Sequence, residues 1–409
     1  MSERSLYPQK SLQTLPTELQ LIIISYLDVA DKATLLESCI LPPNLLITPH
    51  TLNQYDDIGY TLLLAATYAE YQTAVRLLLT SGADPNLPSK IPTDHAATAL
   101  ILASKQNNLK ISDLLLSHGA NANAENDATT RAVHYAAYNN NLKLVDLLLE
   151  YNTDINTHAR DWGTSLKIAA ENGHTRIVRR LIEEGANVNA AYAQPWRPGH
   201  VEEATGRTPL YYAAINGHVE CVRELLEAGA IATHDPAPAI PPNKPGWFVH
   251  PPSLVLVAAK GDISSFEDWI RAYGARNPRG RIPLKPPFVL TADEKSRYAD
   301  VMTLLINAGA DIGFELPNSR ITALHVATAS GNEAAVKVLL QEGANVNART
   351  EGGLSAIVLA RALGYSVIVE MLEGAKGVRP DWRVPIVGPK PATIREIVDV
   401  KTQNPLGKS

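Results

Sequence analysis

Histidine and acidic side chains are the groups in this sequence that could do chemistry, because they can transfer protons or bind metal ions. His134 and His325 each stand at the fourth position of a short motif, "RAVH" and "TALH". Neither has the partner groups of a catalytic or metal site, since the sequence holds no HExxH, GxSxG or GxGxxG pattern and no P-loop. Acidic pairs such as Glu183-Glu184 are typical of a solvated surface. We therefore expect no catalytic residue, no metal and no cofactor, and we expect that the protein is not an enzyme.

The cysteine count and the charge balance bear on the cellular location of the protein and on its classes of partner. Cys39 and Cys221 are the two cysteines, too few for a disulfide framework or a cysteine-based zinc site. Asp and Glu number 42 against 37 Lys and Arg, which predicts no basic face for nucleic acid and no polybasic membrane patch. No apolar run approaches the ~18 residues that a membrane span needs. We expect a cytoplasmic or nuclear location, or both, with no direct contact to nucleic acid or membrane.

The two histidine motifs belong to a pattern that repeats along the chain. A "TxLxxAA"-like stretch followed by "VxxLL" and "GA" begins at residues 61, 98, 131, 164, 208, 322 and 355, and the spacing is 33 residues wherever nothing is inserted after residue 98. A period of this size indicates a solenoid of stacked units. Within each unit the apolar spacing predicts two short helices, which end where Gly accepts a left-handed conformation. No unit can bury its apolar faces alone, so several must stack.

These motifs resemble the ankyrin repeat. The resemblance is carried by "TPL" at 208–210, "ALH" at 323–325 and "GANVNA" at 185–190 and 343–348. It implies an all-α solenoid of helix-turn-helix units with extended hairpin turns, about nine units over residues 56–376. It also implies that the histidine of the motif bonds to backbone near the helix start and the adjacent turn. In function it implies a non-enzymatic scaffold that binds proteins through its concave face, and we expect a monomer.

Interruptions of the pattern divide the solenoid. Pro-rich insertions occupy 191–207 and 231–252, and insertions in a solenoid form loops on one face, often the binding face. Two units within 253–316 are degenerate, one from Ser253 and one from Tyr298. The Pro-rich tail 377–409 lacks the repeat.

The N-terminal part contains a second resemblance, after a segment, 1–14, that we expect to be flexible. Residues 15–39, "LPTELQLIIISYLDVADKATLLESC", have the apolar spacing of one helix and then a second. They resemble the start of an F-box, so 15–55 is interpreted as a small helical F-box-like domain, which implies docking on the adaptor subunit of a cullin-type ubiquitin ligase. The residues that the resemblance assigns to this contact are Leu15, Pro16, Leu19, Ile23, Leu27 and Leu35. Lys32 and Ser38 depart from the family pattern, and the alternative is that these helices only cap the open end of the solenoid.

Aromatic and charged residues at the hairpin tips and on the exposed face of each first helix are the candidate partner-binding residues, because Trp, Tyr and Arg dominate protein interfaces. They are Tyr68, Lys105, Tyr138, Arg160, Trp162, Glu171, Trp196 and Arg197. Each aromatic residue could instead pack its own loop onto the solenoid. Two functions remain open: a substrate receptor of a cullin-type ubiquitin ligase, or a regulator that binds a transcription factor or signalling protein with no ubiquitin role.

Overall fold

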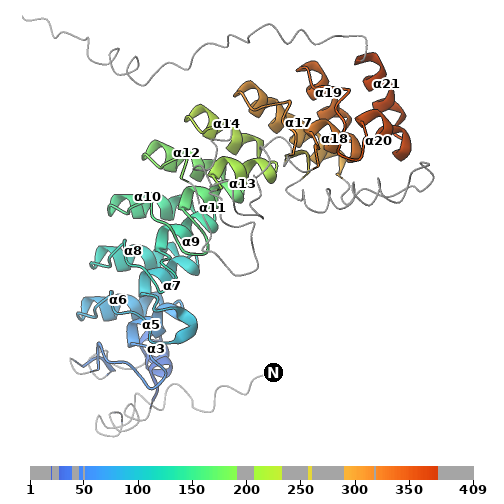
Figure 1. Ribbon diagram of the computed structural model, residues 1–409. Coiled ribbons are helices and arrows are strands. Elements are labelled where there is room, and N and C mark those ends of the chain that lie inside the picture. Colours follow the sequence, from blue (N-terminus) through green and yellow to red (C-terminus); the bar gives the residue numbers. More distant parts are fainter. Residues whose placement is uncertain are drawn as a thin grey trace, which may run out of the picture.

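The computed structural model describes most of the chain, and the regular elements of the described part are helices. The described residues are 20, 27–38, 46–48, 51–190, 207–232, 257–259, 290–316 and 319–375. Figure 1 shows the helices in two rows that follow one arc from the N-terminal to the C-terminal end. The predicted all-α solenoid of stacked helix-turn-helix units is confirmed.

Within the described residues, each unit except the one that contains α17 contributes one helix to each row. The first helices are α5 (Leu62–Tyr68), α7 (Ala99–Lys105), α9 (Ala132–Tyr138), α11 (Ser165–Glu171), α13 (Pro209–Ile215), α18 (Ala323–Ala329) and α20 (Ala356–Leu363). The second helices are α6 (Gln72–Thr80), α8 (Leu109–Ser117), α10 (Leu142–Glu150), α12 (Thr175–Glu183), α14 (Val219–Glu227), α17 (Ala292–Asn307), α19 (Glu333–Gln341) and α21 (Ser366–Ala375). In Figure 1, the second helices α6, α8, α10, α12 and α14 lie on the outer side of the arc. The first helices α5, α7, α9, α11 and α13 lie on the inner side.

Short polar side chains set where the helices begin. The hydroxyl of Thr164 accepts a hydrogen bond from the third amide of α11, and that of Thr208 does the same for α13. Asn141 caps the second helix α10 in this way through its side-chain oxygen. The second helices end at a residue in the left-handed conformation, Gly185 (φ +85°) after α12. Where the sequence has "NT" in place of "GA", Asn152 adopts φ +55°, a conformation that Asn tolerates better than most residues.

Small residues allow the first helices to stack closely. Ala137 of α9, Ala170 of α11 and Ala214 of α13 are fully buried, as are their alanine neighbours one position before. The second helices bury their apolar stripe in the same core, for example Val178 and Leu181 of α12. The apolar faces of successive units thus form one continuous core.

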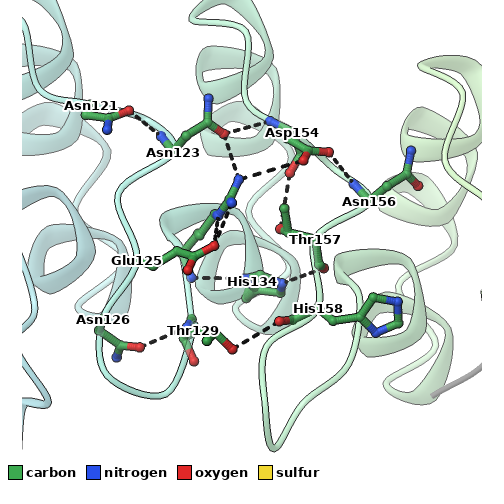
Figure 2. A network of polar contacts seen from close by, with 12 residues as sticks. Asn121, Asn123, Glu125, Asn126, Thr129, His134, Asp154, Asn156, Thr157 and His158 are labelled. Carbon is green, nitrogen blue, oxygen red and sulfur yellow. Dashed lines mark hydrogen bonds and ion pairs between the residues drawn. The ribbon is translucent and has the colours of Figure 1, made fainter. Parts of the chain in front are cut away.

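Hydrogen bonds between hairpins tie neighbouring units together on the side away from the second helices (Figure 2). The amide of Asn123 donates to the carbonyl of Asn152 (3.1 Å), and its side-chain oxygen accepts from the backbone N–H of Asp154 (2.8 Å). Asn86 and Asn189 make the equivalent pair of bonds to the following unit. This asparagine position is therefore a scaffold position.

The two motif histidines have the structural role that the resemblance implied. His134 Nδ1 accepts from the N–H of Arg131 (3.0 Å), and its Nε2 bonds to the carbonyl of Thr157 (3.1 Å) in the next hairpin. His325 makes the matching bonds to Thr322 and Leu354, each 3.2 Å long. Burial lowers the pKa of both imidazoles to about 4, so they are neutral at pH 7. The prediction for these histidines is confirmed.

The unit between α14 and α19 departs from the others. Its second helix α17 has 16 residues, nearly twice the length of its neighbours, and it contacts both α14 and α19 directly. The Tyr298 hydroxyl donates to the carbonyl of Ile215 (3.0 Å). In the preceding unit the equivalent contact is made by His218, whose imidazole bonds to the carbonyl of Glu171. The predicted number of about nine units depends on residues 260–289, which lie outside the described part.

The helix α3 (Val29–Glu37) packs on the first unit at the N-terminal end of the arc. Its Ala33 and Leu36 are buried against α5 and α6, and the Glu37 carboxylate accepts from the N–H of Ala74 (2.8 Å) in the first turn of α6. Residues 1–14, 191–206, 233–252 and 377–409 lie outside the described part, so the predictions for the termini and insertions stay predictions. None of the helices described is both long and apolar enough to cross a membrane.

Candidate functional site

The ends of the first helices present exposed side chains along the inner side of the arc. Tyr68 at the end of α5 is 59% exposed and Tyr138 at the end of α9 is 53% exposed, which is unusual for large aromatic rings. Lys105 at the end of α7 is exposed as well. These three residues occupy the same position of successive units, so they form a line along the face that the sequence predicted to bind a partner.

A hollow of about 650 Å³ opens on this face across α9, α11 and α13. Its lining combines side chains from three consecutive units, among them residues of the hairpin before α11 and Arg207 just before α13. The lining residues are Tyr138, Asp161, Trp162, Lys167, Ile168, Glu171, Asn172, Arg207, Tyr212 and Asn216. Of the predicted binding residues, the structure brings Tyr138, Trp162 and Glu171 together here, whereas Tyr68, Lys105 and Arg160 do not line the hollow.

Trp162 forms an aromatic wall of the hollow. It lies at the tip of a hairpin closed by reciprocal backbone hydrogen bonds between Ala159 and Gly163 (3.0 and 2.9 Å). Its ring packs edge-on against Tyr135, with centroids 5.1 Å apart, and at a tilt of 31° against Tyr138, with centroids 5.2 Å apart. Such aromatic pairs are favourable beyond the area that they bury. Trp162 therefore anchors its own hairpin and also lines the hollow, and its role in partner binding stays a prediction.

Lys167 brings a charge into the floor of the hollow. Its side chain is only 8% exposed, and its Nζ lies 2.6 Å from Glu171 Oε2, one helical turn further along α11. The same ammonium lies 4.1 Å from the centroid of the Tyr212 ring. The carboxylate and the aromatic face offset the cost of placing this ammonium group in a buried position.

Arg207 enters from the other side, immediately before α13. Its guanidinium lies 5.2 Å from the centroid of the Tyr211 ring, and its charge acts on the Tyr212 hydroxyl. The rings of Tyr211 and Tyr212 meet at 81° with centroids 5.3 Å apart. Burial raises the pKa of Tyr212, and the charge of Arg207 opposes that rise. The phenol is therefore neutral at pH 7.

The chemistry available in the hollow is that of binding. Two cations, two carboxylates, two asparagine amides and three aromatic rings line it, with no serine, cysteine or histidine among them. Within the described part of the chain, His, Cys, Asp and Glu form no group of three or more that could hold a metal ion. Such a surface can hold a polar segment with an adjoining apolar side chain.

Comparison with known proteins places this geometry in a family. The family model for ankyrin repeats (three copies) matches residues 62–159, 133–235 and 290–381, together more than half of the chain. The chain belongs to the ankyrin repeat family. A crystal structure of the human ASB11 ankyrin repeat domain is similar, with 20% sequence identity, a TM-score of 0.47, and a match that covers 69% of this chain and 100% of that chain. No curated protein sequence matches the chain significantly.

Membership of this family settles the general function. Ankyrin repeats mediate protein–protein binding, so the chain is a protein-interaction scaffold, and this fold typically has no enzymatic role. The inner face with its hollow is the surface at which the described part gathers exposed aromatic and charged side chains.

Sequence reasoning missed Lys167, Arg207 and Tyr212 as residues of the site. A signal was present, because Lys167 and Tyr211 stand at the fourth position of their motifs, where His134 and His325 have a scaffold role. Arg207 was counted only as the last residue of an insertion. Trp196 and Arg197 lie outside the described residues, as do Leu15, Pro16, Leu19 and Ile23 of the F-box-like segment. Leu27 and Leu35 are described, and both are half-buried.

Proposed function

We propose that this ankyrin repeat protein is a substrate receptor of a cullin-type ubiquitin ligase, acting in the cytoplasm or nucleus. In this role the N-terminal part of residues 15–39 docks on the ligase adaptor, and the inner face of the solenoid selects the protein to be ubiquitylated. The observation that carries the proposal is the F-box-like segment placed directly before a recognition solenoid, with α3 packed onto the first repeat.

The attachment of α3 supports this arrangement. Ala33 and Leu36 are buried against the solenoid, Glu37 caps α6, and the Thr34 hydroxyl lies 3.4 Å from the Tyr71 hydroxyl. A receptor must hold its substrate at a defined distance from the ligase, and these contacts fix the end of the segment relative to the inner face. Leu35 packs partly on the core. We therefore assign it to this attachment and place the adaptor contact on residues 15–27.

The test is association of the purified full-length chain with the purified ligase adaptor. We expect wild type to bind at micromolar concentration and the double variant Leu19→Asp, Ile23→Asp to lose binding, because it introduces two charges into an apolar contact. The matched control is Tyr138→Ala, which changes the inner face and should leave adaptor binding unchanged.

Two outcomes would refute the ligase proposal. One is no association of the wild-type chain with the adaptor. The other is unchanged association of the double variant, which would place the contact elsewhere. Affinity purification that recovers a DNA-binding factor but no ligase subunit would support the alternative role as a regulator of transcription.

A further inference from the structure

We infer that the hollow across α9, α11 and α13 binds an acidic segment of a partner protein, with an Asp or Glu carboxylate on Arg207 and a neighbouring apolar side chain against Tyr138 and Trp162. This inference rests on the protein-binding role of the solenoid and not on the ligase proposal. It assigns a ligand chemistry to the inner face.

Within the described part of the chain, the charges of the hollow leave one cation for a ligand. Lys167 is neutralised by Glu171 at 2.6 Å, so that pair attracts neither sign strongly. Among the described residues, no carboxylate lies within ion-pair distance of Arg207. Two arginines of the neighbouring helix α12 are already paired, Arg179 with Glu224 and Arg180 with Asp146. Arg207 is thus the cation of the hollow with which a carboxylate of a partner protein can form an ion pair.

Arg207 is also held in place before any ligand arrives. The Tyr211 ring packs against the guanidinium, with centroid and guanidinium carbon 5.2 Å apart. This contact leaves N–H groups of the planar guanidinium for a carboxylate, which arginine binds through two parallel hydrogen bonds. Restriction before binding lowers the entropy that binding costs.

The aromatic part of the hollow suits an apolar neighbour of that carboxylate. Tyr138 is more than half exposed while Trp162, beside it, is half-buried. A side chain placed on this pair gains burial of apolar area at a site that is already rigid.

A cationic ligand fits these contacts poorly. The aromatic faces that would hold a cation are already used by the protein itself: Lys167 lies over Tyr212, Arg207 lies over Tyr211, and Trp162 packs between Tyr135 and Tyr138. A further positive charge would also meet Arg207 and Lys167. Asp161, exposed at the rim, would favour it, whereas the second carboxylate of the lining, Glu171, is already paired with Lys167.

The experiment screens a display library of short random peptides against the immobilised full-length chain. Selected sequences are then made as acetylated and amidated peptides, so that the termini carry no charge, and their affinities are measured by fluorescence anisotropy. We expect selected peptides to carry Asp or Glu next to Trp, Phe or Leu. We expect replacement of that acid by its amide to weaken binding about tenfold, the loss of a charged hydrogen-bonded pair.

Two variants of the hollow should shift the affinity in opposite directions. Arg207→Gln should weaken binding of the selected peptides about tenfold, whereas Asp161→Asn should strengthen it, because it removes a negative charge from the rim. A misfolded variant could not produce the second result. Arg223→Gln on α14 of the same unit is the matched control and should leave the affinity unchanged.

The inference is overturned if no peptide is enriched, or if the enriched peptides are basic or uncharged. It is also overturned if Arg207→Gln leaves the affinity unchanged or Asp161→Asn weakens it. Neither result changes the adaptor-binding test, which concerns residues 15–27, so failure of one proposal is distinguishable from failure of the other.

Discussion

The buried motif histidines predict that acid loosens particular repeats before others. The pKa of His134 and of His325 is lowered from 6.5 to about 4 in the folded chain, chiefly because burial disfavours the charged imidazole. The unfolded chain therefore binds more protons than the folded chain between pH 6.5 and about 4. The stability that depends on the neutral imidazole is complete above that window and is lost as the pH falls through it. At pH 5 the loss is about 2 kcal/mol for each histidine relative to pH 7.

The physical cost is located at two hydrogen bonds. Protonation places a proton on Nδ1, which in the folded state accepts from the N–H of Arg131 or Thr322. The imidazolium cannot keep that bond, and its charge stays buried in an apolar core. The unit must open locally for the histidine to be protonated, and in a solenoid such an opening is largely confined to the unit and its neighbours.

Hydrogen–deuterium exchange with mass spectrometry can resolve this effect by unit. After correction for intrinsic exchange rates, peptides from 131–160 and 322–354 should lose protection between pH 7 and pH 5 by an amount that corresponds to about 2 kcal/mol. The unit 61–88 is the internal control, because its fourth position is the buried Leu64 and it contains no histidine. His134→Leu should abolish the pH-dependent part in 131–160 while lowering protection at pH 7. Equal losses in all three units, or an unchanged pH response in His134→Leu, would refute the reasoning.

Two further predictions concern the packing that holds the binding face. Glu37→Ala should lower the stability of the first unit by about 1 kcal/mol, because the α6 amide that Glu37 caps loses its acceptor. Glu37→Gln should retain part of that stability. Hydrogen exchange of the α6 amides measures both variants, and unchanged exchange of α6 in Glu37→Ala would exclude the capping role. Ala137→Leu should destabilise the chain by about 1–3 kcal/mol or more, since the side chain is fully buried between stacked helices. Tyr138→Leu, one residue along and exposed, is its control, and equal effects of the two substitutions on thermal unfolding would contradict the stacking described for α9.

The solenoid itself was predictable from the sequence because its determinants are local. Thr caps, alanine pairs and left-handed glycines each act within a few residues, and they recur at a fixed period, so an error in one unit is corrected by the others. The length of α17 was also indicated, by "TADE" at 291–294, in which Thr291 and Glu294 form a capping box. The repeat pattern instead predicts a unit that starts at Tyr298, which lies inside this helix.

The hollow was predictable only in part, because it is made by residues that are far apart in the sequence. Exposed aromatic type was enough to select Tyr138 and Trp162. Lys167 and Tyr212, by contrast, are 45 residues apart, and their contact depends on how closely α11 and α13 stack across an insertion. No local spacing encodes that distance. Arg207 acquires its role only through the two tyrosines that follow it.

The fourth position of the motif explains why the hollow lies where it does. In the units of His134 and His325 this position carries an imidazole that bonds the helix start to the next hairpin. In two of the three units that line the hollow, those of α11 and α13, it carries Lys167 and Tyr211, whose charge and ring face Tyr212 and Arg207 instead. A position that serves the scaffold elsewhere thus contributes to a polar site in two adjacent units, and sequences that break a local rule are expected at functional sites. This departure is independent of the exposed aromatic residues, and it selects the same region of the inner face.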